Sequence, residues 1–296
     1  MPSLRKVRPV RQNIMHTSSK QTSKLISYWL RHHPKEAGIQ VDAFGWAPID
    51  QILHALEVRN IKVSLQDLIE LNSSSDKVRW EIDTHSGKLR ATHGHSFHVI
   101  LEDKVKLPPD ELYHGTSVQY VMEIAEKGLK SMNRQFVHLS ETIEMAKNVG
   151  IRHGKPIIIE IETASLVKAG WKFYQSSDTI WLTANIPADY LCFRPWHPID
   201  TSMDFFIKEL KREIGNRHSH FLYPHLNNLL AVWQSSASDH VLFKDQETGK
   251  CYAIHLTYTK MDQEVNEWPR IKTYKTMQDW IAEGLWYDQQ CFYDFT

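Results

Sequence analysis

Four short polar clusters combine arginine or histidine with apolar flanks, and these residue types could bind and act on a phosphate. The clusters are "LRHHP" from Leu30, "LRATHGHS" from Leu89, "YHGTS" from Tyr113 and "VGIRHGKP" from Val149. Arginine presents a planar fork of donors that suits phosphate oxygens, and several arginines can share one dianion. A cation at a helix end more often interacts with the helix dipole, and a His-Gly pair is often only a turn. Each cluster alone is weak, but four in one chain favour an anion-binding site.

The first cluster lies at the end of a helix that must be partly buried. Apolar residues recur there at helical spacing, at Leu25, Ile26, Trp29 and Leu30, and the helix is expected to end before Pro34. Such a helix can bury one side and present cationic residues from the other.

Residues 20–105 are predicted to form a winged-helix, RNA-binding lobe, preceded by a basic arm over residues 1–19. A second helix should start at Pro48, and a third at the N-cap Ser64, with Asp67 completing a capping box. The alternation in "VRWEIDTHSGKLRA" predicts a hairpin that turns at Ser86-Gly87. Three short helices with a β-ribbon are typical of nucleic-acid-binding domains, although fold alone does not decide function.

The remainder of the chain is predicted to form two further α+β domains, over residues 106–199 and 200–296. The segment "LEDKVKLPPDEL" is expected to link the first of them to the N-terminal lobe. Short apolar runs alternating with brief helices then predict a small mixed or antiparallel sheet flanked by helices, with Gly128 capping one helix. After residue 200, an amphipathic helix, a hairpin and a tryptophan-containing helix predict an extra small α+β domain. The whole chain is therefore expected to be of the α+β class.

Composition is that of an ordinary globular protein, with 42% hydrophobic and 24% charged residues. No apolar run approaches the roughly 20 residues needed to span a bilayer, and three cysteines without ligand or disulfide spacing indicate a reducing, cytoplasmic location. Residues 1–35 hold eight Lys or Arg and no Asp or Glu, whereas residues 200–296 hold ten against fourteen. The basic leading segment suggests a polyanionic partner. His93, His95 and His98 lack neighbouring ligands at metal-binding spacing, so no metal is expected.

In combination, seven segments resemble the RNA 2'-phosphotransferase family, known also as tRNA 2'-phosphotransferase, over residues 20–196. They are "SYWLRHHP", "GWAPIDQIL", "LRATHGHS", "LYHGTS", "VHLS", "VGIRHGKPIIIEIE" and "FYQSSDTIWLTANIPADYL". The resemblance implies a winged-helix lobe, a lobe of the ADP-ribosyltransferase type, and NAD bound in the cleft between them. It implies the catalytic residues Arg31, His32, Arg90 and Arg152. It also implies the NAD-binding residues His114, Gly115, Thr116, His138, Ser140 and Trp181.

The reaction implied by the resemblance removes an internal RNA 2'-phosphate, as left by splicing-type ligation in tRNA processing, and transfers it to NAD. It passes through an RNA–phospho–ADP-ribose intermediate and yields 2'-hydroxyl RNA, nicotinamide and ADP-ribose 1'',2''-cyclic phosphate. A phosphate monoester with a second pKa near ~6 is already anionic at neutral pH, so it needs no activating carboxylate. The three arginines would clamp the phosphate, and His32 would move a proton.

The sequence departs from the family pattern in two places, and two alternative functions stay open. His93 stands where the family usually has glutamine, and residues 200–296 lie beyond the family's usual extent, as either a stabilising appendage or a partner-recruiting module. The same arginines could serve an ADP-ribosyltransferase that caps a terminal phosphate of nucleic acid. A non-enzymatic winged-helix regulator that senses NAD is the other alternative, against which all four implied catalytic residues speak.

Overall fold

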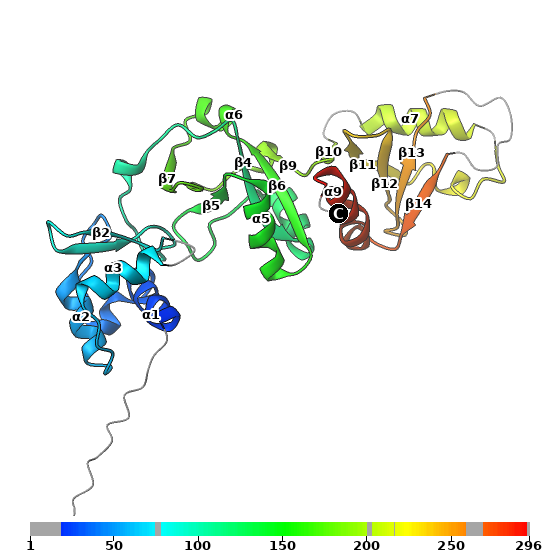
Figure 1. Cartoon of the computed structure of the whole chain (residues 1–296). Coiled ribbons are helices and arrows are strands. Elements are labelled where there is room, and N and C mark those ends of the chain that lie inside the picture. The colour runs from blue at the N-terminus through cyan, green and yellow to red at the C-terminus, as the bar shows by residue number, and fades with distance from the viewer. Residues whose placement is uncertain (1–18, 75–77, 200–202, 216, 259–268, 295–296) are drawn as a thin grey trace, which may run out of the picture. The chain divides into compact units, whose positions relative to one another are not determined.

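The computed structural model describes residues 19–74, 78–199, 203–215, 217–258 and 269–294, so nearly all of the expected basic arm lies outside the described residues. The chain forms two compact units. One comprises the residues up to Lys104 together with Met132–Gln135, and the other comprises Val105–Ser131 and the residues from Phe136 onward. Both units combine helices with antiparallel sheets (Figure 1), which confirms the α+β class.

The first unit packs three helices against a three-stranded antiparallel sheet of order β1-β3-β2. Its elements are α1 (Ser19–Arg31), η1 (Pro34–Ala37), β1 (Trp46–Pro48), α2 (Ile49–Glu57), α3 (Leu65–Ser73), β2 (Trp80–Asp83), β3 (Lys88–Ala91) and η2 (Glu102–Lys104). Its core is built around Trp29, Leu56 and Trp80, all of which are buried. Every helix within the described residues of the chain is too short or too polar to cross a bilayer.

Local sequence signals explain most of these boundaries. The Ser64 hydroxyl accepts the Asp67 N–H at 3.2 Å, and the Asp67 carboxylate accepts the Ser64 N–H at 2.7 Å, which confirms the capping box. The hairpin and its turn near Gly87 (φ +64°) are also confirmed. The expected helix start at Pro48 is wrong by one residue, because Pro48 is still extended (ψ 132°) and ends β1, so that α2 begins at Ile49.

The N-terminal part of the second unit is a six-stranded sheet of order β7-β8-β5-β4-β6-β9, in which every pair is antiparallel. Its strands are β4 (Glu111–Ser117), β5 (Val137–Ser140), β6 (Pro156–Glu162), β7 (Phe173–Ser177), β8 (Ile180–Thr183) and β9 (Leu191–Cys192). Its helices are η3 (Val118–Tyr120), α4 (Val121–Lys127), α5 (Ile143–Gly150), η4 (Ile151–His153), α6 (Thr163–Lys168) and η5 (Ala188–Tyr190). Gly128 follows α4 with φ +76°, which confirms its expected capping position.

The C-terminal part of the second unit is a five-stranded antiparallel sheet of order β10-β11-β12-β13-β14. Its strands are β10 (Trp196–Pro198), β11 (Leu229–Ser235), β12 (His240–Asp245), β13 (Cys251–His255) and β14 (Ile271–Tyr274). Its helices are α7 (Met203–Ile214), η6 (Tyr223–His225), α8 (Met277–Trp280), the π-helical turn η7 (Ile281–Leu285) and α9 (Trp286–Phe292). The amphipathic α7 lies along this sheet (Figure 1) and buries Phe206, Leu210 and Ile214 in their own apolar cluster with β11–β13 side chains.

One hydrophobic core joins the two sheets of the second unit. It contains Leu112 and Ile159 from the six-stranded sheet and Trp233, Trp280 and Leu285 from the C-terminal part. In addition, the buried Gln289 of α9 accepts the Ile158 N–H at 2.9 Å and donates to the Ile158 carbonyl at 2.8 Å. The side chain of Gln289 thus satisfies both backbone polar groups of Ile158 in β6, as a neighbouring strand would. The expected division at residue 199 stays a prediction.

Candidate active site

Arg31 and His32 lie where α1 ends, in the first unit. Trp29 and Leu30 of the same turn are buried, so the helix is fixed on its apolar side. The carbonyl of Arg31 accepts the Ser96 N–H at 2.9 Å, and a Cβ on Gly94 would lie 3.5 Å from Cδ of Arg31. The Arg31 side chain therefore lies directly over the Gly94 backbone. Its Nε is buried and makes no hydrogen bond within the described residues.

The electrostatic surroundings of Arg31 are cationic. Burial, followed by the charges of Arg134 and Arg79, lowers the pKa of Arg31 to about 10. Burial and the neighbouring charges of Arg31, His33 and Arg134 also lower the pKa of His32 below its ordinary value. His32 is therefore a neutral imidazole at pH 7 and can accept a proton. Arg31 forms no ion pair within the described residues, so its charge is available to an anionic ligand.

His95, which is 4% exposed, is near enough to this pair for their charges to affect it. Burial, and then the charges of Arg31 and Lys104, lower its pKa to about 4, so the ring is neutral. A Cβ on Gly45 would lie 3.5 Å from His95 Nε2, while the His95 carbonyl accepts the Gln135 N–H at 3.0 Å. His95 is thus a buried, neutral residue that packs against Gly45 and whose backbone holds Gln135. In the described part of the chain, no three His, Cys, Asp or Glu side chains lie together as a metal site would require.

Arg90 lies on β3 of the same unit, but its guanidinium is already paired. It donates from Nε and Nη2 to Glu81 at 2.9 and 2.7 Å, and from Nη2 to Asp103 at 2.6 Å. It also lies 4.6 Å above the ring of Trp46. These carboxylates raise the pKa of Arg90 despite its burial. Arg90 is held rigidly in place, and a phosphate would have to share it with, or displace, the half-exposed Asp103.

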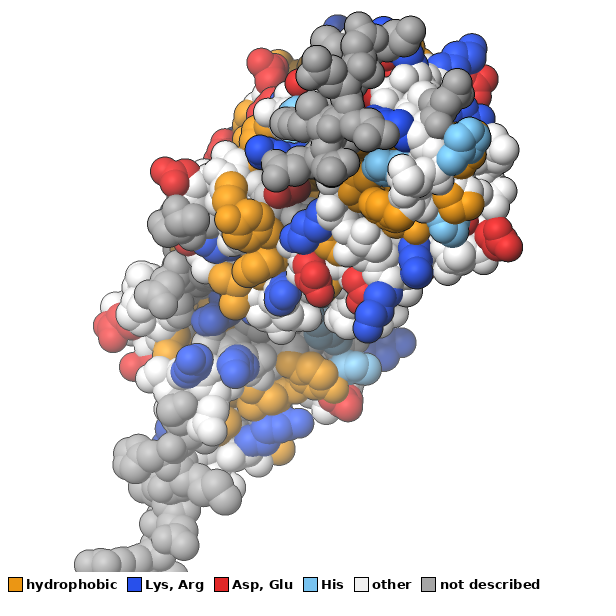
Figure 2. All heavy atoms as spheres, turned by 90° about the vertical axis from the view of Figure 1, so that its right-hand side faces the viewer, with side chains coloured by type: hydrophobic (Ala, Val, Ile, Leu, Met, Phe, Trp, Pro, Cys, Tyr) orange, Lys and Arg blue, Asp and Glu red, His pale blue; other side chains and the backbone are white. Residues whose placement is uncertain are grey.

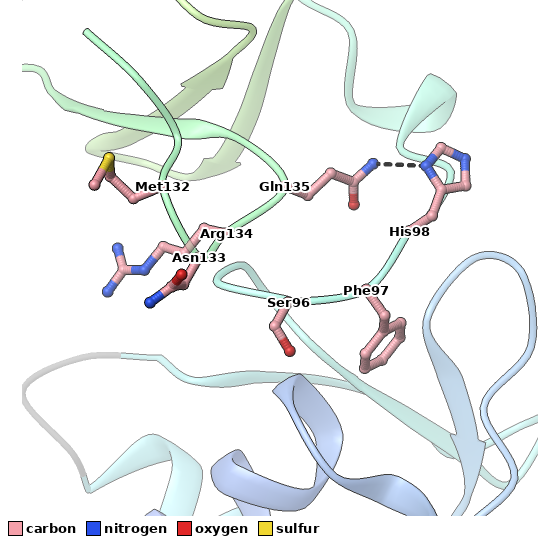
Figure 3. Close-up of a pocket in the computed structure, with 7 residues that line it drawn as sticks. All are labelled: Ser96, Phe97, His98, Met132, Asn133, Arg134 and Gln135. Atoms are coloured by element: carbon pink, nitrogen blue, oxygen red, sulfur yellow. Dashed lines mark hydrogen bonds between the residues drawn. The ribbon is translucent and has the colours of Figure 1, made fainter.

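A pocket of about 470 Å³ lies next to Ser96, within the first unit. It is lined by Ser96–His98 on one side and by Met132–Gln135 on the other (Figure 3). Gln135 fixes the second segment, because its amide accepts the Val99 N–H and donates to the Val99 carbonyl, both at 2.9 Å. Arg134 was not among the residues expected from the sequence. The only signal for it is an arginine in the polar run "NRQ" directly before the predicted strand "FVHLS".

The six residues expected to bind NAD lie in the second unit, on three adjacent strands. His114, Gly115 and Thr116 are on β4, His138 and Ser140 on β5, and Trp181 on β8. His114 Nδ1 donates to the carbonyl of His138 at 3.0 Å, which ties β4 to β5 and leaves Nε2 unprotonated in the neutral ring. Trp181 is 3% exposed and belongs to the hydrophobic core.

Arg152 is placed by two glycines that let α5 pack directly on β4. A Cβ on Gly115 would lie 1.7 Å from the carbonyl oxygen of Ala146, and one on Gly150 would lie 2.5 Å from the carbonyl oxygen of Thr116. A glycine is therefore needed at position 115, because any side chain there would collide with the backbone of α5. Arg152 follows immediately in η4 and is exposed. The second unit thus brings Arg152 next to the strand of His114 and Thr116, while Arg31, His32 and Arg90 belong to the first unit.

Comparison with known proteins decides the family. Residues 17–185 match the model of the family described as "RNA 2'-phosphotransferase, Tpt1 / KptA family". The chain belongs to this family. It is 40% identical over 177 residues to a protein of Hahella chejuensis, covering 60% of this chain and 95% of that protein. It is 42% identical over 174 residues to a protein of Acetivibrio thermocellus, covering 58% and 94%. Both relatives bear the name "Probable RNA 2'-phosphotransferase".

The RNA 2'-phosphotransferase match contains all ten residues expected at the site and Arg134, but stops before the C-terminal sheet. A protein of Nostoc punctiforme with the same name is 40% identical over 169 residues, which cover 57% of this chain and 93% of that relative. Residues 200–296 are thus an addition to the family's matched region. On the face that Figure 2 presents, basic, acidic and apolar side chains are interspersed.

Proposed function

We propose that this chain is an NAD-dependent RNA 2'-phosphotransferase, acting on RNA that bears an internal 2'-phosphate. The observation that carries the proposal is Arg31, a family-matched arginine whose buried Nε has no hydrogen-bond partner within the described residues, which forms no ion pair there, and whose pKa is lowered by a second arginine, Arg134. Such a cation is costly without a counter-charge, and a phosphate dianion would supply one.

The proposal also assigns the two units. The three helices and antiparallel sheet of the first unit support a winged-helix lobe for RNA over residues 20–105. The six-stranded antiparallel sheet supports an ADP-ribosyltransferase-like lobe for NAD over residues 106–199. Residues 200–296 would then be the additional α+β domain.

The chemistry of the β4, β5 and β8 residues fits a dinucleotide. Two buried polar atoms there, the Ser117 hydroxyl and the Trp181 indole nitrogen, have no hydrogen-bond partner within the described residues. Together with His114, Thr116 and Ser140 they offer donors and acceptors beside an apolar core, which suits a ligand with both sugar hydroxyls and aromatic rings. When bound, NAD would supply an electrophilic ribose carbon and the leaving group nicotinamide.

The chain's own residues would then hold charge and move a proton. Arg31 and Arg152, with Arg90, would neutralise the phosphate oxygens as charge develops on them. His32, whose pKa is lowered by burial and by its cationic neighbours, would take up and release a proton at Nδ1 or Nε2. No catalytic carboxylate is needed, because the attacking phosphate is already ionised.

The decisive experiment is a reaction of the purified full chain with NAD and a short RNA carrying one internal 2'-phosphate, analysed by mass spectrometry. The expected products are 2'-hydroxyl RNA, nicotinamide and ADP-ribose 1'',2''-cyclic phosphate. An RNA with a 5'-terminal phosphate instead is the matched control. Unchanged RNA and NAD would contradict the proposal, and ADP-ribosylation of the terminal phosphate would identify a capping enzyme.

A further inference from the structure

Arg134 is a second arginine near Arg31, and the hydrogen bonds of the next residue, Gln135, hold its backbone in place. Within the described residues it forms no ion pair and no hydrogen bond. Burial lowers its pKa, and its charge in turn lowers those of Arg31 and His32. Ser96 links the two arginines, because its N–H donates to the Arg31 carbonyl and because it lines the same pocket as Arg134.

The backbone around Arg134 is fixed by hydrogen bonds to the segment on the other side of the pocket. Gln135 donates its N–H to His95, its amide bonds both polar groups of the Val99 backbone, and the same amide lies 3.2 Å from His98 Nδ1. Figure 3 shows Asn133 and Arg134 extending to the same side of the segment, away from Gln135 and His98. The hydrogen bonds of Gln135 therefore fix the backbone from which the Arg134 side chain extends.

A pair of nearby cations with no carboxylate partner is stabilised by an anion. Arg134 adds a planar fork of donors, and the Asn133 amide adds neutral donors on the same side. If Arg31 holds the 2'-phosphate, the nearest other anion on the substrate is the 3'-phosphodiester, since it is attached to the adjacent carbon of the same ribose. Two cations close enough for the charge of one to lower the pKa of the other would therefore suit two phosphates on one nucleotide.

We propose that Arg134, assisted by Asn133, binds the 3'-phosphodiester of the nucleotide whose 2'-phosphate is held by Arg31. This inference rests on the proposed function and deepens it. Arg134 makes the site selective for an internal 2'-phosphate, because a 2'-phosphate on a 3'-terminal nucleotide has no such phosphodiester.

The test compares two RNAs of equal length and sequence, one with an internal 2'-phosphate and one with the 2'-phosphate on its 3'-terminal nucleotide. Arg134→Gln is expected to lower the ratio of kcat/KM for the internal over the terminal RNA by about 10- to 100-fold, the loss typical of a charge-assisted hydrogen bond. The change should appear mainly in KM. Arg134→Lys should restore part of the ratio, because it keeps the charge but loses the fork.

Lys62→Gln is the matched control, since it removes one positive charge from an exposed position of the same unit. It should leave the ratio unchanged. For binding of the internal RNA without NAD, the slope of log affinity against log salt should fall by about 0.7 in Arg134→Gln. Because Arg134 is an uncompensated cation, its loss should not lower the melting temperature.

The outcomes separate the two claims. If the wild-type chain turns over the internal RNA but Arg134→Gln matches Lys62→Gln in both ratio and salt slope, Arg134 does not bind the phosphodiester. If the wild-type chain consumes neither RNA, the proposed function fails, and the salt slope alone then decides whether Arg134 contacts a phosphate.

Discussion

At the scale of single residues, the first unit contains two arginines, Arg31 and Arg134, that form no ion pair within the described residues. Burial, and then the charge of Arg134, lower the pKa of Arg31, and burial together with both arginines lowers that of His32, whereas Arg90 is paired with Glu81 and Asp103. Arg31 and Arg134 could therefore bind an anion directly, whereas Arg90 would have to share or give up a carboxylate partner.

Substitution of the arginines tests their assignment. Arg31→Ala or Arg152→Ala should lower product formation about 100- to 1,000-fold, the usual loss for one donor to a charged transition state. Turnover is measured by release of nicotinamide, and circular dichroism checks that each variant is folded. A folded variant that works within tenfold of wild type would refute that residue's role.

His95 should make the stability of the first unit depend on pH. In the unfolded chain its pKa is about 6.5, whereas in the folded unit burial and cationic neighbours lower it to about 4. The unfolded state therefore binds more protons between these values, and the free energy of unfolding should fall by up to about 3 kcal/mol as pH decreases from about 6.5 to about 4. Urea titrations across this range should show a shallower decline in His95→Gln, and parallel curves for the two proteins would contradict the assignment.

At the scale of elements, the structure shows which features a sequence can predict. The helix α3 was predictable because its cap involves only Ser64 and Asp67, three residues apart. The three-residue strand β1 was not, since so short a segment carries no periodic signal. Arg134 could not be predicted as a site residue for a different reason. Its position depends on hydrogen bonds between Gln135 and Val99, which are 36 residues apart. Site residues inside local motifs could be named, whereas those placed by tertiary contacts could not.

Gln289 gives an element-scale prediction. Gln289→Leu should lower the free energy of unfolding of the second unit by about 2 to 5 kcal/mol, because it leaves the buried N–H and carbonyl of Ile158 without partners. Chemical denaturation monitored by tryptophan fluorescence measures the change. Gln290→Leu on the same helix is the control and should change stability by less than about 1 kcal/mol. Equal effects would show that the two bonds contribute little.

At the scale of the whole molecule, the additional C-terminal part and the family-matched part share one core. A chain ending at residue 199 would lose Trp233, Trp280 and Leu285 from the apolar cluster that also contains Ile159 of β6. We expect this truncated chain to show reduced hydrogen-exchange protection on β6, while protection in α1–α3 of the first unit persists. Undiminished protection of β6 would show that the core does not require the added residues.

The position of Met132–Gln135 in the first unit has a consequence for how the protein is made. All the other residues of that unit precede residue 105, and the chain completes β4 and α4 of the second unit before it supplies these four. During synthesis, the N-terminal unit must therefore emerge with Val99 still lacking Gln135 and with Arg31 still lacking its cationic neighbour. Its helices and sheet can form early, but the pocket beside Ser96 is completed only after the ribosome has moved well into the second unit.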